Sequence, residues 1–185
     1  YDENVFKVML VQFVSLKRDG EKVSMSTRSG EFETLADVVK EVGVDATRFF
    51  FLMRSSDSHL DFDLELAKKA SADNPVFYIQ YAHARICSIF RTATEQGIKL
   101  LDSVDIDLSP LKNEEEFVMI KKILSFTEII EKSAELLEVH RVPFYLQDLV
   151  GTFHRYYSRN RIVSDDHALS FARLFLMNCL RITIC

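Results

Sequence analysis

Hydrophobic positions in the first part of the chain indicate a β-hairpin. Residues 8–16 read Val-Met-Leu-Val-Gln-Phe-Val-Ser-Leu, a run of β-branched, aromatic and aliphatic side chains that predicts a largely buried strand. Asp19 and Gly20 follow shortly afterwards, and an Asp-Gly pair tolerates the positive φ angles of a tight hairpin turn. Residues 21–26 are then the returning strand or the loop that leaves it.

Two helices are predicted between the hairpin and the middle of the chain. Thr34 can cap a helix over residues 35–42, and Gly43 stands just after its last turn, where glycine is favoured. Asp45 can cap a second helix over residues 46–54. This second helix contains a Phe-Phe-Phe-Leu-Met run that is too apolar for a solvent-facing helix, so it is expected to be buried.

From residue 74 onward the pattern is helical only, and a boundary is placed near residues 71–74. Asn74 as cap and Pro75 as first helical residue favour a helix over residues 75–96. Three more stretches follow over residues 113–140, 144–159 and 166–185; the first is long enough that a break is expected, and the last is expected to be the most enclosed. Four amphipathic helices with short connections form a bundle. The predicted fold class is therefore mainly α, a helical bundle preceded by a small α/β segment.

The first three bundle helices have apolar stripes that are expected to face the core. These stripes are Val76, Ile79, Ile86 and Phe90; then Ile120, Ile123, Leu124, Thr127, Ile130, Ala134 and Leu137; then Leu146, Leu149, Val150, Phe153 and Tyr157. His83 lies within the first stripe. A histidine in such a place is more often a hydrogen-bonded core residue than a ligand or a base.

The composition is typical of a soluble globular protein. Of the 185 residues, 48% are hydrophobic and 28% are charged, which excludes disorder. The 23 Lys and Arg against 28 Asp and Glu give a net charge of −5, which excludes a uniformly basic nucleic-acid coat but not a local basic face. Three widely spaced cysteines indicate a reducing compartment, and no apolar run reaches the ~20 residues of a membrane span. We therefore expect a cytoplasmic protein without a membrane contact.

Charge is distributed unevenly along the predicted bundle. Residues 102–139 contain ten acidic residues and four lysines, whereas residues 140–185 contain six arginines and three aspartates. Arginine and tyrosine interleave in residues 153–161, and Arg155 and Arg159 are expected to point outward. Guanidinium groups pair with phosphates and flat rings stack on unpaired bases, so RNA binding is one interpretation. A solvated basic face is the other.

The helix over residues 75–96 has a second aromatic face. Tyr78, Tyr81, Arg85 and Ser88 lie within roughly a quarter turn of one another at ~100° per residue. Either these side chains contact RNA or a protein, or they pack against a neighbouring part of the same chain.

Motifs of common active sites are absent from the sequence. The five histidines show no zinc-binding spacing, and there is no nucleophile elbow, P-loop or dinucleotide fingerprint, so no metal site is predicted. Asp61 and Asp63 lie two apart on an extended segment and are expected to be surface or capping groups. Three consecutive glutamates, residues 114–116, suit the first turn of a helix.

One stretch is specific to a family. Residues 22–31 read Lys-Val-Ser-Met-Ser-Thr-Arg-Ser-Gly-Glu. They resemble the Lys-Met-Ser-Lys-Ser signature loop of class I aminoacyl-tRNA synthetases, in the Met-Ser-Thr-Arg-Ser-Gly form of arginyl-tRNA synthetases. Residues 43–50 are similar to the segment after that loop, and residues 74–85 (Asn-Pro-Val-Phe-Tyr-Ile-Gln-Tyr-Ala-His-Ala-Arg) to the first helix of the family's anticodon-binding domain. The resemblance covers essentially the whole chain.

The resemblance implies ATP-dependent attachment of arginine to tRNA(Arg). In such enzymes the signature loop closes over the ATP phosphates and stabilises charge in the transition state. The residues expected to contact ATP are Lys22, Ser24, Met25, Ser26, Thr27 and Arg28. Ser24 and Thr27 replace the two signature lysines, so Arg28 is the expected catalytic cation and Lys22 a second candidate. Mg²⁺ is expected with ATP in the intact enzyme.

The same resemblance divides the chain. Residues 1–73 are expected to be the end of the catalytic domain, with the signature loop and a stem-contact region, and residues 74–185 a truncated anticodon-binding bundle. The expected tRNA contacts are Tyr78, Tyr81, Arg85, Arg155 and Arg159. Since the family's nucleotide-binding core lies upstream, this chain alone is expected to be an inactive monomer without bound ATP. Two alternatives stay open: a helical protein-interaction module, and the equivalent part of another class I synthetase.

Overall fold

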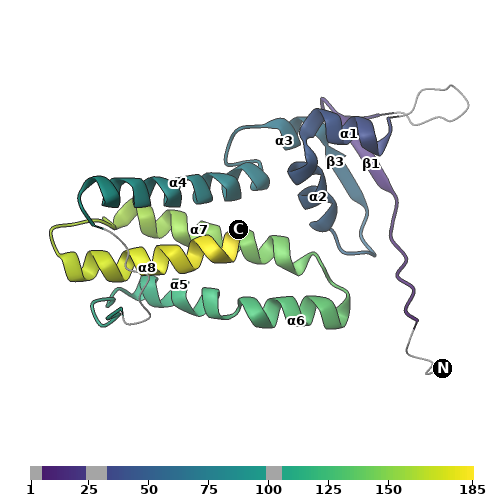
Figure 1. Ribbon diagram of the computed structural model, residues 1–185. Coiled ribbons are helices and arrows are strands. Elements are labelled where there is room, and N and C mark those ends of the chain that lie inside the picture. The colour runs from purple at the N-terminus through teal and green to yellow at the C-terminus, as the bar shows by residue number, and fades with distance from the viewer. Residues whose placement is uncertain (1–5, 24–32, 99–105) are drawn as a thin grey trace, which may run out of the picture.

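The computed structural model describes residues 6–23, 33–98 and 106–185. In this part of the chain, a small sheet with three short helices lies at one end, and five further helices form an elongated bundle (Figure 1). The predicted class, a mainly α fold in which a small α/β segment precedes a helical bundle, is confirmed.

The sheet has the strand order β2-β1-β3. β1 (Val14–Arg18) pairs with β2 (Glu21–Lys22) in an antiparallel hairpin and with β3 (Leu60–Asp63) in parallel. Asp19 and Gly20 form the turn with φ angles of 51° and 83°, so the predicted Asp-Gly hairpin is confirmed. The parallel strand β3, which hydropathy alone did not indicate, is reached through two helices between residues 35 and 52.

The first strand is shorter than predicted. Residues 8–13 are not part of the sheet and extend away from it (Figure 1), and Phe13 is 88% exposed. Among the described residues, strand partners exist only from Val14 onward, so the apolar side chains before it have no sheet face to cover. The prediction of a largely buried strand over residues 8–16 is therefore wrong for residues 8–13.

Three short helices surround the sheet: α1 (Leu35–Val42), α2 (Val44–Leu52) and α3 (Leu64–Lys68). Thr34 caps α1 in a capping box with Asp37, as its position predicted. Asp45 does not cap α2, because Gly43 (φ 87°) ends α1 and is also the N-cap of α2, which places Asp45 in the first turn. The predicted span of residues 46–54 is corrected accordingly. Asp63 caps α3, which agrees with a capping role for this carboxylate.

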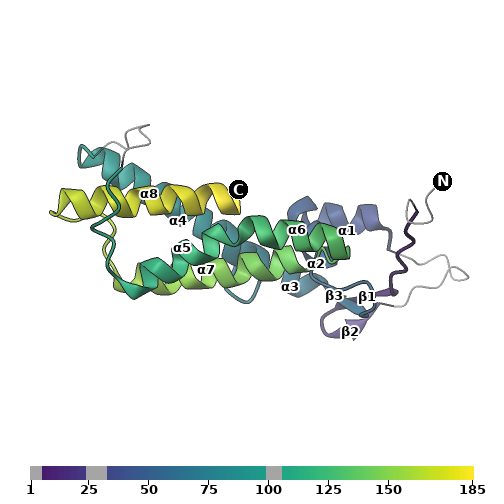
Figure 2. The same ribbon diagram turned by 90° about the horizontal axis from the view of Figure 1, so that it is seen from below.

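The bundle consists of α4 (Pro75–Glu95), α5 (Glu114–Leu124), α6 (Phe126–Leu136), α7 (Arg141–Arg159) and α8 (His167–Ile184). Helix α7 packs against α4, α5 and α6, and α8 packs against α4 and α5. Figure 2 shows α8 running beside α4, with the sheet at the far end of the molecule. Asn74 caps α4, as expected, and the structure adds Asn113 and Asp166 as the caps of α5 and α8.

Two hydrophobic cores stabilise these parts. One fills the space between the sheet and its helices and includes Leu16, Phe50 and Phe62. The other fills the bundle, and its buried residues include Ile79, Ile86, Leu149 and Phe153, which the apolar stripes predicted, together with Leu174 and Leu180 of α8. Phe49 of α2 packs against both cores.

The second predicted apolar stripe, over residues 120–137, does not match the inward-facing side of the helices in its second half. The expected break occurs at Ser125, which ends α5 and precedes α6. Five residues at and after the end of α5 were predicted to face inward but are exposed: Leu124, Thr127, Ile130, Ala134 and Leu137. The side chains that turn inward are instead Phe126, Ile129 and Ser133. The break shifts the helical phase, so one continuous periodicity does not describe both helices.

Candidate nucleic-acid interface

Arg85 lies at the centre of an aromatic cluster between α4 and α7. Its guanidinium carbon is 4.5 Å from the ring centroid of Tyr81 and 4.8 Å from that of Tyr157. Arg85 also donates hydrogen bonds to Tyr81 Oη at 2.7 Å and to His154 Nδ1 at 3.2 Å. We call Tyr81, Arg85, His154 and Tyr157 the Arg85 cluster. Tyr81 is 44% exposed, so part of this cluster faces solvent.

His154 holds the cluster together in its neutral form. Its Nδ1 accepts from Arg85, which can only donate, so the ring proton is assigned to Nε2, 3.4 Å from the carbonyl oxygen of Tyr78. Burial is the main cause that lowers the pKa of His154, and the positive charge of Arg85 lowers it further, while the bond to Tyr78 acts in the opposite direction. The ring therefore joins the backbone of α4 to the Arg85 side chain.

The structure brings together only part of the predicted contact residues. Tyr81 and Arg85 belong to the cluster, and Tyr78 packs half-buried against the His154 ring with the centroids 4.4 Å apart. Tyr78 is thus less open than its position on the helix suggested. His154 and Tyr157 were not among the predicted contacts, although both belong to the arginine- and tyrosine-rich run. Tyr157 was expected in the inward stripe, and it is half-buried against the core while also contacting Arg85.

Arg155 and Arg159 lie on the outer side of α7, as predicted, and both are exposed. Arg159 Nη1 forms an ion pair with Glu115 Oε1 at 3.0 Å, and Arg155 donates to the hydroxyl of Thr152 at 3.3 Å. These two arginines therefore place guanidinium groups on the outer side of α7, and neither contacts Arg85.

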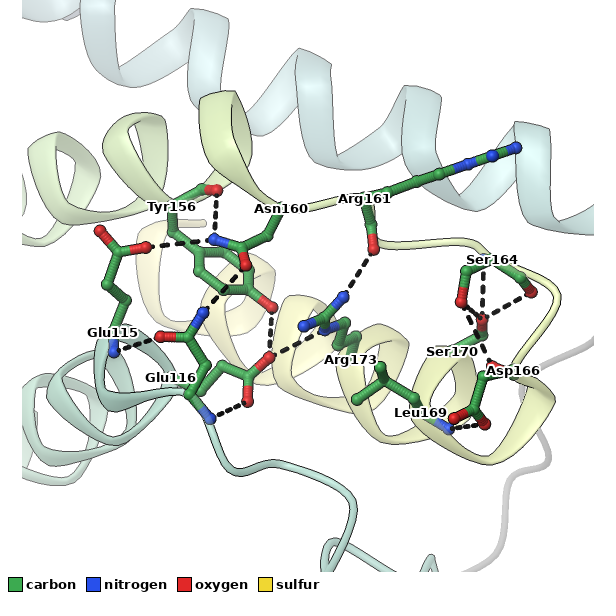
Figure 3. Close-up of polar contacts among 11 residues, drawn as sticks. Glu115, Glu116, Tyr156, Asn160, Arg161, Ser164, Asp166, Leu169, Ser170 and Arg173 are labelled. Atoms are coloured by element: carbon green, nitrogen blue, oxygen red, sulfur yellow. Dashed lines mark hydrogen bonds and ion pairs between the residues drawn. The ribbon is translucent and has the colours of Figure 1, made fainter.

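A buried charge network supports the same end of α7 (Figure 3). Glu116 is fully buried; its Oε1 accepts from Arg173 Nε at 2.8 Å and from Tyr156 Oη at 2.6 Å, and its Oε2 accepts from the backbone N–H of Asn113 at 3.1 Å. Burial raises the pKa of Tyr156, and the hydrogen bond to Glu116 raises it further. Three helices, α5, α7 and α8, thus meet at one carboxylate.

The network also fixes the loop that joins α7 to α8. Arg173 Nη1 donates to the carbonyl oxygen of Arg161 at 2.8 Å, and Ser170 Oγ accepts from the N–H of Ser164 at 2.9 Å. Figure 3 shows the Arg161 side chain directed away from the network. The sequence indicated that Glu116 lies in the first turn of a helix but not that it is buried. The signal for its burial was an arginine, Arg173, within the most apolar helix.

The predicted ATP contacts lie at the other end of the molecule. Ser24, Met25, Ser26, Thr27 and Arg28 fall outside the described residues, and Lys22 ends β2 just before them. Lys22 is exposed, with its Nζ 3.9 Å from Asp61 Oδ1.

The segments that flank this stretch are tied to β1. Val23 donates its N–H to the Leu16 carbonyl at 2.9 Å, and Glu33 accepts from Arg18 at 2.8 Å. Arg18 also forms an ion pair with Glu41, which pairs with Lys68, and the hydrogen bonds from both cations lower the pKa of Glu41 to about 2. The backbone just before the predicted signature loop and the Glu33 side chain just after it are therefore both bonded to β1.

The described residues contain neither a cluster of potential metal ligands nor a helix that could span a membrane. Within residues 6–23, 33–98 and 106–185, no three His, Cys, Asp or Glu side chains come together as a metal site. Over the same ranges, no helix is long and apolar enough to cross a membrane.

Comparison with known families identifies the bundle. A profile of the DALR anticodon binding domain matches residues 79–185, more than half of the chain. The chain belongs to the DALR anticodon-binding family. The DALR domain contains nearly all of α4 and the whole of α5–α8, and thus every residue of the Arg85 cluster and of the buried charge network.

Relatives of the whole chain are arginine–tRNA ligases. The chain is 55% identical to the one from Geobacter sp. (strain M21) over 185 residues, covering 99% of this chain and 33% of the relative. It is 53% identical to the one from Syntrophotalea carbinolica over 175 residues, covering 95% and 32%. The chain therefore spans about a third of the length of these curated relatives and matches their C-terminal part.

Solved structures agree with this assignment. A Campylobacter jejuni protein described as an arginyl-tRNA synthetase superimposes with a TM-score of 0.80 at 32% identity, over 95% of this chain and 37% of that one. The arginyl-tRNA synthetase of Thermus thermophilus gives a TM-score of 0.65 at 25% identity, over 85% and 26%. The resemblance to arginyl-tRNA synthetases drawn from residues 22–31, 43–50 and 74–85 is confirmed.

Proposed function

We propose that this chain is the tRNA-binding part of an arginine–tRNA ligase that uses ATP to attach arginine to tRNA(Arg). The observation that supports this proposal most directly is the DALR domain, together with relatives that are named for the arginine reaction. These names favour arginine over the amino acids of other class I synthetases. In this proposal residues 1–73 belong to the catalytic domain and residues 74–185 bind the anticodon region. The enzyme acts as a cytoplasmic monomer.

The Arg85 cluster presents the kinds of side chain that bind single-stranded RNA. Tyr81 presents a partly exposed ring for stacking, and Arg85, held between two rings, presents hydrogen-bond donors to a phosphate or a base edge. Tyr78 supports this arrangement through His154, and Arg155 and Arg159 contact phosphates beside it.

The test is binding of a tRNA(Arg) transcript, measured by fluorescence anisotropy at several salt concentrations. Each phosphate contact adds about one unit to the slope of log affinity against log salt, so replacing Arg155 and Arg159 together by Gln should lower that slope by about two. Arg141→Gln, in the first turn of the same helix, is the matched control and should leave the slope unchanged. Equal slopes for the double variant and the control would remove α7 from the RNA contact, and no binding of tRNA by the unaltered chain would refute the proposal.

The predicted signature loop carries the second part of the proposal. Lys22 fits a role at phosphates, because it is exposed and the carboxylate recorded beside it is 3.9 Å away. In the full-length enzyme, Ser24, Met25, Ser26, Thr27 and Arg28 line the bound ATP, whose reaction with arginine activates the amino acid. The chain's own contribution is then a positive charge from Arg28 and Lys22 at the phosphates, where Mg²⁺ is also expected.

The loop is tested by Arg28→Ala in the full-length enzyme. The variant should slow arginyl-adenylate formation, because losing a transition-state donor typically raises the activation free energy by ~2–4 kcal/mol. The affinity for tRNA should be unchanged. Weakened tRNA binding with normal adenylate formation would instead assign this loop to RNA contact.

A further inference from the structure

Helix α6 bears apolar side chains on two sides, and the bundle core uses only one of them. Phe126 and Ile129 turn inward, where the Phe126 ring lies 5.7 Å from that of Tyr145 on α7. A different side carries four exposed residues, which we call the α6 row: Thr127, Ile130, Ala134 and Leu137. A surface helix of a bundle needs a single apolar stripe to face the core. The α6 row is therefore an apolar stripe that the described part of the fold does not bury.

The α6 row has the spacing of a helix that packs against another helix. Its residues follow one another at intervals of three, four and three, which is the repeat of side-by-side helix packing. Two of the four, Thr127 and Ala134, are small and allow a second helix to approach closely. Figure 1 shows α6 at the outer edge of the bundle, and among the described elements it packs mainly against α7 and α5.

An apolar hollow of about 190 Å³ adjoins the start of the row. It lies between α5, α8 and the loop that precedes α5, and its walls include Ile120, Leu124 and Phe175. Leu124 is 74% exposed and is the last residue of α5, directly before α6. Since a cavity of about 150 Å³ can hold a benzene ring, this hollow has room for one apolar side chain of a binding partner.

The charge beside the row determines which partner fits it. The helix contains three glutamates, all exposed, and one lysine, so its net charge is −2. At ~100° per residue, Glu131 and Glu135 lie next to the row on its outer side. Lys132 is itself paired with Glu135 at 3.4 Å. This surface repels the phosphates of RNA and opposes a like-charged second copy of α6, whereas it attracts a cationic protein segment.

We propose that the α6 row is the docking site of a basic amphipathic helix from a protein partner. Apolar side chains of that helix pack along Ile130 and Leu137, and one enters the hollow beside Leu124. Its lysines or arginines face Glu131 and Glu135. The site uses neither the Arg85 cluster nor the predicted signature loop, so it does not depend on the proposed function.

The test uses a designed peptide as the partner. The probe is a fluorescently labelled helix of about 18 residues, built from alanine, from leucines spaced three and four apart, and from flanking lysines. A second peptide has glutamates in place of the lysines. Each is titrated with the unaltered chain, with the full-length enzyme and with two variants of each, and binding is followed by fluorescence anisotropy.

The two variants separate the row from exposed leucine in general. One combines Ile130→Ser with Leu137→Ser. The other, Leu136→Ser, is the matched control, because Leu136 lies on the same helix outside the row and is 54% exposed, against 41% for Ile130 and 43% for Leu137. Circular dichroism establishes that both variants are folded.

We expect the lysine peptide to bind both the chain and the full-length enzyme, less tightly as salt is added, and the glutamate peptide not to bind. The double variant should weaken binding of the lysine peptide more than about tenfold, because two large side chains no longer become buried. Leu136→Ser should change it less than about twofold.

Four outcomes would overturn the proposal. The first is equal affinity of the double variant and the control, or no binding of the lysine peptide at all. The second is binding by the chain but not by the full-length enzyme, which would show that the enzyme covers the row itself. The third is weaker tRNA binding by the double variant, which would assign the row to RNA. The fourth is a dimer in sedimentation that only the double variant dissociates, which would assign the row to a second copy.

Discussion

Replacing Arg173 by methionine tests how much the buried charge network stabilises the bundle. The substitution keeps most of the side-chain volume but leaves the carboxylate of Glu116 fully buried, with Tyr156 and the Asn113 N–H as its remaining donors. Removing one partner of a buried ion pair costs about 3–5 kcal/mol, because the other charge stays buried without its counter-charge. For a protein of this size the loss corresponds to a fall in melting temperature of about 6–20 °C.

The assay is urea unfolding followed by far-ultraviolet circular dichroism, arranged as a double-mutant cycle. Glu116→Leu and Arg173→Met are made singly and together in a Tyr156→Phe background, so that no buried hydroxyl loses its acceptor. Because both charges are absent from the double variant, it should recover at least about 2 kcal/mol of the sum of the two single losses. Arg159→Gln is the control: its side chain is 68% exposed, and a surface pair of this kind contributes about 0–1 kcal/mol. Losses of the two single variants that simply add would refute the idea that Glu116 and Arg173 stabilise the fold as a pair.

Two further predictions concern the bundle core and the Arg85 cluster. Phe153→Ala should lower the free energy of unfolding by about 3–5 kcal/mol, because the Phe153 ring is fully buried; a loss below about 1 kcal/mol in the same urea assay would contradict its place in the core. The pKa of His154 lies below its usual 6.5 in the folded chain, so as the pH falls through 6.5 the unfolded state takes up the proton first and stability decreases. His154→Gln should therefore lose less stability than the unaltered chain between about pH 7.5 and about pH 5.5, and equal losses would show that His154 does not titrate in this way.

Local signals in the sequence predicted much of the fold, and longer-range contacts account for the rest. Thr34 and Asn74 were identified as helix caps because capping depends on a residue and its next three neighbours. The strand expected over residues 8–16 was too long because a strand also needs a partner, which hydropathy does not report.

The candidate site shows the same limit. Tyr81 and Arg85 could be paired from the sequence, since they lie one turn apart on one helix. His154 is 69 residues from Arg85, and only the packing of α7 on α4 brings its ring nitrogen to the guanidinium. The five contacts within residues 24–28 came from the family resemblance alone, and they lie outside the described residues.

The joining of three helices at Glu116 restricts how sequences of this domain can change during evolution. A change of Glu116 or Arg173 alone gives a protein with an unmatched buried charge. The expected loss of folding free energy is a large fraction of the roughly 5–15 kcal/mol that stabilises a typical domain. Such an intermediate is selected against even if the two changes together are harmless. Residues 116 and 173 are therefore expected to covary among related sequences, whereas the exposed Arg159 is expected to vary independently of both.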